Sequence, residues 1–249
     1  MNPRYAWARQ LLALGILLVV WEAAARAGML NPLFVPSPKG IGSALYDLFS
    51  DGRIWPHLEA TFTAALAGLA LGIVVGILLG VLGALVPVIA ELIEPVMTLL
   101  NAIPRVILAP LFVIWLGIGL ASKVALSFIL VAVLIFFTVF TGIRQVDRRL
   151  VERIITLGGG RWDLVRHVYL PSVTAWILGN MKIAVGFAFT GAVVGEFVAA
   201  TSGLGYLLSF AQSTYNSALM LALVLLIMVV VLVIFAIAGQ LEKYLMRWN

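Results

Sequence analysis

The feature that most constrains the fold is a series of long apolar runs. Of the 249 residues, 63% are hydrophobic and 11% are charged, whereas an average soluble domain has about 25% charged residues. A helix needs about 20 residues to cross the hydrocarbon core of a bilayer, and six segments approach or exceed that length: 10–27, 60–86, 93–116, 123–143, 174–198 and 218–241. Lipid offers the backbone no hydrogen-bond partners, so these segments must be helices. The sequence predicts an all-α membrane protein with six transmembrane helices in one domain (1–249, core 58–241) and no cleaved leader.

The distribution of Lys and Arg predicts the orientation, because these residues concentrate on the cytosolic side of membrane proteins. With the N-terminus inside, ten of the 16 lie on that side: Arg4, Arg9, Arg144, Arg148, Arg149, Arg153, Arg161, Arg166, Lys243 and Arg247. We therefore expect both termini and the 144–172 loop in the cytosol, with Lys123 among the cations outside. The net charge of +5 then reflects topology and contact with membrane lipid, not nucleic-acid binding.

Smaller patterns predict how the helices pack. Gly68, Gly72, Gly76 and Gly80 recur every fourth residue, so they share one helix face and permit close approach of a neighbouring helix. On the outside, apolar residues at helical spacing indicate a short amphipathic helix at about 40–50. A second amphipathic piece follows the turn at 201–206.

The 144–172 loop has a pattern of its own. Leu150 to Leu157 reads as a helix that glycines 158–160 terminate, because glycine adopts the left-handed cap. A second short helix runs from Arg161 to Tyr169, and Leu170-Pro171 is expected to stop it, since a residue before proline disfavours helix. Two short helices at an angle can enter a groove on a partner. The alternative is an ordinary basic loop that only fixes topology.

The spacing Glu152, Gly158, Val168-x-Leu170-Pro171 resembles the "EAA" loop of ABC importer permeases, although Arg153 and Ile154 stand where the family has alanines. Further segments resemble the nitrate/sulfonate/taurine branch of the type I family: Pro36-Ser37-Pro38, Ile103-Pro104-Arg105, Ala109-Pro110-Leu111, Trp115-Leu116-Gly117-Ile118-Gly119 and Gly203-Leu204-Gly205-Tyr206. The resemblance covers nearly the whole chain.

This resemblance implies the type I ABC importer permease fold in the bacterial cytoplasmic (inner) membrane. Two permease chains, identical copies by expectation, would form the pathway. Two ATPase subunits would bind the cytosolic face, and a periplasmic or lipid-anchored substrate-binding protein would deliver the substrate. The chain has no Gly-x4-Gly-Lys-Ser/Thr phosphate loop, so it is not expected to be an enzyme, and ATP would be bound by the partner subunit. The branch favours a small anion such as a sulfonate, taurine or nitrate; a thiamine-pyrimidine or riboflavin type of vitamin precursor is the alternative.

Candidate coupling residues follow from the motif and from position. Glu152, Gly158, Leu170 and Pro171 are motif residues by resemblance. Arg161, Trp162 and Arg166 lie on the second short helix, where an arginine can pair with acidic groups of the ATPase.

Ionisable residues inside a span are candidates for the translocation pathway, because lipid exposure of a charge costs several kcal/mol. Arg105 lies between Pro104 and Pro110, which are expected to break the helix and suit a cavity wall; the alternative is an arginine that snorkels to headgroups at the cytosolic end. Lys182 and Glu196 are too far apart to pair along one helix, and pairing with other helices is favoured over a pathway role. Glu22 and Arg26 are spaced for a structural ion pair.

Two other protein classes fit the sequence less well. An intramembrane enzyme needs paired catalytic groups at membrane depth, but all four aspartates lie in loops or surface helices. The two histidines are isolated and there is no cysteine, so no metal site is expected. A secondary transporter driven by an ion gradient usually contains internal repeats, and none is visible.

Overall fold

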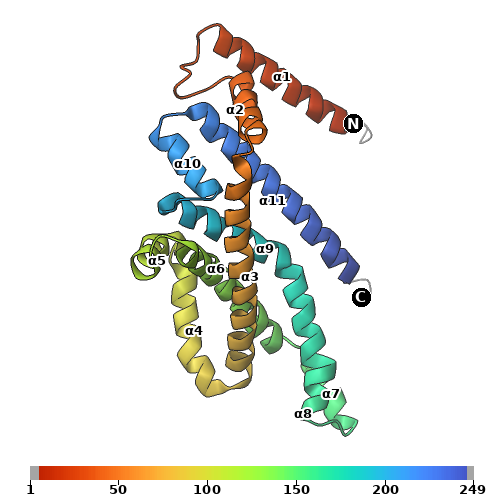
Figure 1. Ribbon diagram of the computed structural model, residues 1–249. Helices are drawn as coiled ribbons and strands as arrows, with labels where there is room; N and C mark the ends of the chain where they lie inside the picture. The colour runs from red at the N-terminus through yellow and green to blue at the C-terminus, as the bar shows by residue number, and fades with distance from the viewer. Residues whose placement is uncertain (1–5, 246–249) are drawn as a thin grey trace.

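The computed structural model describes residues 6–245, and this part of the chain is entirely helical, with turns and loops between the helices. Figure 1 shows an elongated bundle with α7 and α8 at one end (the loop end) and α2 and α10 towards the other (the far end). The elements are α1 (Ala6–Arg26), α2 (Pro38–Ser50), α3 (Ile54–Leu85), α4 (Pro87–Ala102), η2 (Arg105–Ile107), α5 (Leu108–Leu116), α6 (Leu120–Arg144), α7 (Arg148–Thr156), α8 (Arg161–Leu164), η3 (Val165–Tyr169), α9 (Leu170–Val198), α10 (Leu204–Ser213) and α11 (Ser217–Leu245). The all-α prediction is confirmed.

The core forms where α6 packs between α3 and α9 (Figure 1). The predicted glycine face of α3 meets α6 at matching four-residue intervals: Gly68 faces Ser127, Gly72 faces Val131, Gly76 faces Ile135 and Gly80 faces Val139. A Cβ added at these glycines would lie 2.3–2.8 Å from the Cβ of the facing residue. No side chain fits in that space, so the glycines allow the two helix backbones to pack in direct contact.

Within the described residues, four helices are long and apolar enough to cross a membrane: Ile54–Leu85, Leu120–Arg144, Trp162–Val198 and Ser217–Gln240. A bent pair of helices makes a fifth if it is counted as one span. The 21-residue α1, which carries Arg9, Glu22 and Arg26, does not meet the same test. The structure therefore gives four or five spans, where the sequence predicted six.

The segment predicted as the third span, 93–116, is a broken helix. Between α4 and the helical stretch Arg105–Leu116 the chain turns by 91°. The break lies at Ile103-Pro104, both extended, because proline disfavours helix at the residue before it. Pro110, which was expected to break the helix as well, lies in the first turn of α5, where a missing N–H interrupts no hydrogen bond.

The far end contains the two predicted amphipathic helices. Buried Leu48 of α2, Ile54 of α3, Leu204 of α10 and Leu223 of α11 pack into one apolar cluster, which joins these four helices. The predicted ion pair of α1 is also present, with Arg26 Nε 2.7 Å from Glu22 Oε1. Glu22 also accepts a hydrogen bond from the backbone N–H at 39 (3.1 Å), so α1 is tied to the start of α2.

Candidate functional site

The loop between α6 and α9 begins with α7, whose two ends are fixed by local hydrogen bonds. The Asp147 side chain accepts from the N–H of residue 149 at 2.9 Å and caps the N-terminus,. At the C-terminus Gly158 has φ +81°, and the N–H groups of Gly158 and Gly159 bond to the carbonyls of Ile155 and Ile154, both at 2.9 Å. This is a Schellman motif. Termination of the first helix by glycine is confirmed.

The second helix of the loop does not stop at Leu170-Pro171, so that prediction is wrong. It begins at α8, where Asp163 Oδ2 accepts from the Gly160 N–H at 2.8 Å, and it continues through η3 into α9. Residues Trp162–Val198 form one 37-residue helix. A proline ring clashes with the carbonyl four residues earlier in an α-helix. Here η3 is a π-helical turn, in which the Leu170 N–H bonds to the Val165 carbonyl, and this wider turn accommodates Pro171.

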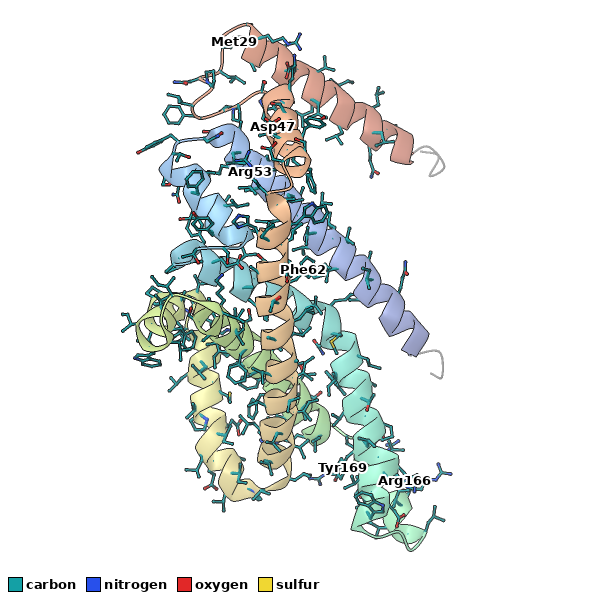
Figure 2. The ribbon with its side chains drawn as sticks, in the orientation of Figure 1. Met29, Asp47, Arg53, Phe62, Arg166 and Tyr169 are labelled. Carbon is teal, nitrogen blue, oxygen red and sulfur yellow. The ribbon has the colours of Figure 1, made fainter. Side chains whose placement is uncertain are left out.

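The loop presents apolar side chains at the end of the molecule. Leu157 is 77% and Trp162 73% exposed, and Leu150 and Ile155 are exposed as well. Figure 2 shows Arg166 and Tyr169 at this end, far from Met29 at the opposite end. Glu152 and Arg166 are exposed, whereas the side chain of Arg161 lies outside the described part of the structure.

A cavity of about 310 Å³ opens beside α7. Its lining includes Arg144 at the end of α6, Arg148 and Glu152 on α7, and Tyr169. Of the motif residues, the structure thus brings Glu152 to a recess between the end of α6 and the start of the long helix. Leu170 and Pro171 directly follow Tyr169 on that helix, and Leu170 is exposed whereas Pro171 is half-buried.

Arg105 lies at the bend between α4 and α5 and reaches across to α6 and α9. Its Nη1 donates to the Leu130 carbonyl (3.2 Å) and its Nη2 to Asn101 Oδ1 (3.1 Å). Its Cζ lies 5.3 Å from the centroid of the Phe187 ring, within range of a cation–π interaction. Leu130 is close to the middle of α6, so a snorkelling arginine at the end of a span does not fit this position.

The two charged residues predicted on α9 face different neighbours. Lys182 lies against α11, where a Cβ added at Gly239 would be 2.8 Å from Lys182 Cε. Glu196 is 1% exposed and lies near the far end of α9. Its Oε1 is 3.8 Å from Nζ of Lys123 on α6, and its Oε2 accepts from Thr61 Oγ1 on α3 at 2.8 Å. Pairing of Glu196 with another helix is therefore observed.

Sequence reasoning missed Lys123 and Thr61. Lys123 was counted among the cations on the outer side, at the start of the predicted span 123–143, and no partner was expected for it. The structure places it in the first turn of α6, where it is 4% exposed. The signal that points to this site is Gly203-Leu204-Gly205. A Cβ at Gly203 or Gly205 would lie 2.0 or 2.1 Å from atoms of α9, so glycine at both positions indicates close packing on that helix.

Residues 72–247 match the family described as the binding-protein-dependent transport system inner membrane component. The matched region runs from the glycine face of α3 through the loop, α9 and α11. This chain belongs to that family.

Two curated relatives align with the permease over most of its length. It is 35% identical to the riboflavin transport system permease protein RibX of Chloroflexus aurantiacus, over 96% of this chain and 89% of that protein. It is 27% identical to the taurine transport system permease protein TauC of Escherichia coli, over 95% of this chain and 88% of that protein.

A solved structure shares the fold of the permease. A chain of the MetNI methionine ABC transporter, crystallised in inward-facing conformations, superposes with a TM-score of 0.61 at 22% identity and covers 78% of this chain and 94% of its own. The permease is thus the multi-pass inner-membrane subunit of a binding-protein-dependent ABC importer, and it is not itself catalytic. This assignment excludes the two other protein classes considered from the sequence, an intramembrane enzyme and a secondary transporter driven by an ion gradient. Such a system includes an ATPase and a substrate-binding protein as partners.

Proposed function

We propose that this permease forms half of the substrate pathway and that its ATPase drives it through the 144–172 loop. The observation that carries the proposal is the exposed apolar surface of that loop. Leu157 and Trp162 are about three-quarters exposed on a segment whose backbone is fixed by its own caps. Exposed aromatic and aliphatic anchors on a rigid element are typical of binding surfaces. Glu152, Gly158, Arg161, Trp162, Arg166, Leu170 and Pro171 are the proposed contact and shape residues.

A second, identical permease chain completes the proposed pathway. The helices around the bend expose large apolar side chains, including Leu92, Leu99 and Ile114, 67–78% exposed. Arg105 lies at the same bend at mid-span, where contact with lipid alone would be costly for a charge. A second copy packed on this face would enclose a water-filled pathway between the two chains. Water in that pathway would then solvate the guanidinium of Arg105. Two ATPase subunits then match the two loops.

The proposed topology keeps α1 as a sixth span and both termini in the cytosol. The large apolar side chains of α1 between Leu11 and Val20 are 41–69% exposed. Such a surface suits contact with lipid or with the second copy. Both ends then lie on the same side of the membrane as the arginine-rich loop.

A small anion, a sulfonate or taurine in particular, is the proposed substrate. TauC, a taurine permease, aligns over nearly the whole chain, and Arg105 supplies a partly exposed cation beside Pro104 at the bend. Asn101 and the Phe187 ring hold that cation in place. Pro110, Lys182 and Glu196 contribute to the walls or the packing around the pathway.

Riboflavin or a similar vitamin precursor is the second candidate substrate, because RibX aligns at 35% identity. Arg105→Gln separates the two. For an anionic substrate we expect uptake to fall at least about tenfold, the effect of removing a charged hydrogen-bond donor. For a neutral heterocycle we expect uptake to change by less than about twofold.

The coupling role is tested by purifying the tagged permease in mild detergent and measuring the ATPase subunit that comes with it. Gly158→Val is expected to abolish co-purification, because a β-branched residue strongly disfavours the observed φ of +81°,. Glu152→Lys is expected to weaken it.

Gly28→Val is the matched control. Gly28 has φ +72° and open space around its Cβ position, as Gly158 does, but it lies at the far end, after α1. The control variant should retain the ATPase. Equal loss in both variants, or retention in both, would contradict coupling through this loop.

A further inference from the structure

The N-terminus of α10 is held by side chains from other helices. Its capping position is Gly203, which has no side chain to offer. Side chains of α3 and α9 accept hydrogen bonds from its first N–H groups instead. The N–H of Gly203 donates to His57 Nδ1 (3.0 Å), that of Leu204 to Thr61 Oγ1 (2.9 Å) and that of Gly205 to Glu196 Oε2 (3.0 Å). Free N–H groups at a helix start require such partners, so the position of α10 depends on both α3 and α9.

Lys123 lies between two acceptors in this joint. Its Nζ donates to the Ser202 carbonyl at 2.7 Å, in the turn that leads into α10, and it is 3.8 Å from Glu196 Oε1. That oxygen is buried and has no hydrogen-bond partner. A buried carboxylate oxygen without a partner is unfavourable. Nζ would have to move by about 1 Å towards Oε1 to reach typical hydrogen-bond distance. In the observed state the ammonium is thus bonded to Ser202 and lies just beyond hydrogen-bond distance of Glu196.

Helix α9 joins this site to the loop end of the molecule. At the contact of α6 with α9, Gly191 and Gly195 face the backbone at Ser127 and Lys123, and Ser127 Oγ donates to the Ala188 carbonyl at 2.8 Å. Glu196 also lies on the same unbroken helix as the 144–172 loop, because Trp162–Val198 is continuous. A helix of this length spans about 55 Å at 1.5 Å per residue. A tilt imposed at the loop would therefore act on the helix that carries Glu196.

We propose that Lys123 is a two-position latch for α10: in the observed state it holds the turn at Ser202, and when α9 shifts it pairs with Glu196 and lets α10 move. Lys123 and Glu196 are then positioning residues of the transport cycle, and α10 is its moving element at the far end. This inference rests on the proposed coupling role of the 144–172 loop for its driving motion. Small displacements at packed interfaces are commonly converted into such two-state rearrangements.

The test uses the complete transporter, with its ATPase and binding protein, in lipid nanodiscs. The permease has no cysteine of its own, so an introduced cysteine gives a clean signal on its band. Ala211 of α10 is fully buried, and Ala211→Cys is close to isosteric. We expect its reaction with a water-soluble maleimide to be at least about tenfold faster in the ATP–vanadate-trapped state than without nucleotide. Ala64→Cys, equally buried on α3 but outside the α10 cluster, should stay protected in both states.

Variants of the latch give the second arm of the test, measured without nucleotide. In the Ala211→Cys background, Lys123→Met should raise the resting rate to that of the trapped state, because Ser202 is released. Lys123→Arg keeps the positive charge and should leave the resting rate low. This variant also keeps the test possible if the methionine variant fails to fold.

Two results would overturn the latch. The first is that Lys123→Met leaves the labelling rate of Ala211→Cys without nucleotide unchanged. The second is that, with Lys123 intact and the ATPase still bound, vanadate trapping leaves that rate unchanged. Loss of the ATPase itself would instead contradict the coupling proposal, and the nucleotide-free arm would still decide the latch.

Discussion

The two ends of the permease hold their key segments by opposite means. At the loop end, α7 and α8 are fixed by hydrogen bonds between residues two to five apart, and their apolar side chains are exposed. At the far end, two of the three bonds that fix α10 come from side chains more than 140 positions away in the sequence. Of these, Thr61 is buried and His57 is half-buried. The contrast fits the two proposed roles. The loop proposed to meet the ATPase is folded by local bonds, and the helix proposed to respond to the rest of the molecule is held through distant contacts.

The largest expected effect that tests this contrast comes from removing the buried carboxylate. Glu196→Ala leaves Lys123 buried without its counter-charge, and we expect the free energy of unfolding to fall by about 4 kcal/mol. Glu152→Ala, at the exposed loop end, should change it by less than about 0.5 kcal/mol. Unfolding of the purified permease in mixed micelles measures both. Equal losses would show that the two ends do not differ in this way.

A smaller effect is expected from adding one methyl group to the backbone at each end. The Cβ of Gly205→Ala would lie 2.1 Å from the Val193 carbonyl oxygen, so we expect a loss of about 3 kcal/mol from overpacking. At Gly160→Ala the nearest atom is 3.8 Å away, and the expected cost is below about 1 kcal/mol. The melting temperatures of the two variants report the difference. Near-equal values would mean that α10 can be displaced from α9 at little cost.

The smallest effect on stability is expected at Trp162, the exposed aromatic residue of the loop. The same change should clearly weaken binding of the ATPase. Trp162→Ala should weaken binding of the ATPase by about 2 kcal/mol, or roughly 30-fold, while the melting temperature stays the same. Trp115→Ala, on α5 and 66% exposed, is the matched variant and should leave ATPase binding unchanged. A fall in melting temperature for Trp162→Ala would mean that the loop is part of the folded core after all.

The same contrast explains which features could be predicted from the sequence. The glycine face of α3, the Schellman end of α7 at Gly158 and the Glu22–Arg26 pair are each marked by a pattern of residues a few positions apart, and each is found in the structure. Lys123 and Thr61 could not be found in this way, because their partners come from helices distant in the sequence. Lys123 was counted with the cations on the outer side, and its own segment gives no sign that it is buried against Ser202 and Glu196.

Both errors about proline have local physical reasons. Leu170-Pro171 was read as a stop, but a π turn at 165–169 makes room for the ring and the helix continues. Pro110 was read as a second break, but it falls in a first helical turn. Propensity rules describe what proline disfavours in a regular α-helix; they do not specify where a wider turn or a new helix start will relieve the clash.

The glycine face of α3 has a consequence for how the protein is made. The ribosome completes α3 before residues 86–119, and α6 follows only after them. At roughly 5–20 residues per second, this leaves α3 for a few seconds without the helix that its glycines fit. During that interval its bare backbone face is covered by lipid or by the insertion machinery. Lengthening the 86–119 segment should therefore lower the yield of folded permease without altering the stability of the molecules that do fold, which makes translation speed a determinant of assembly.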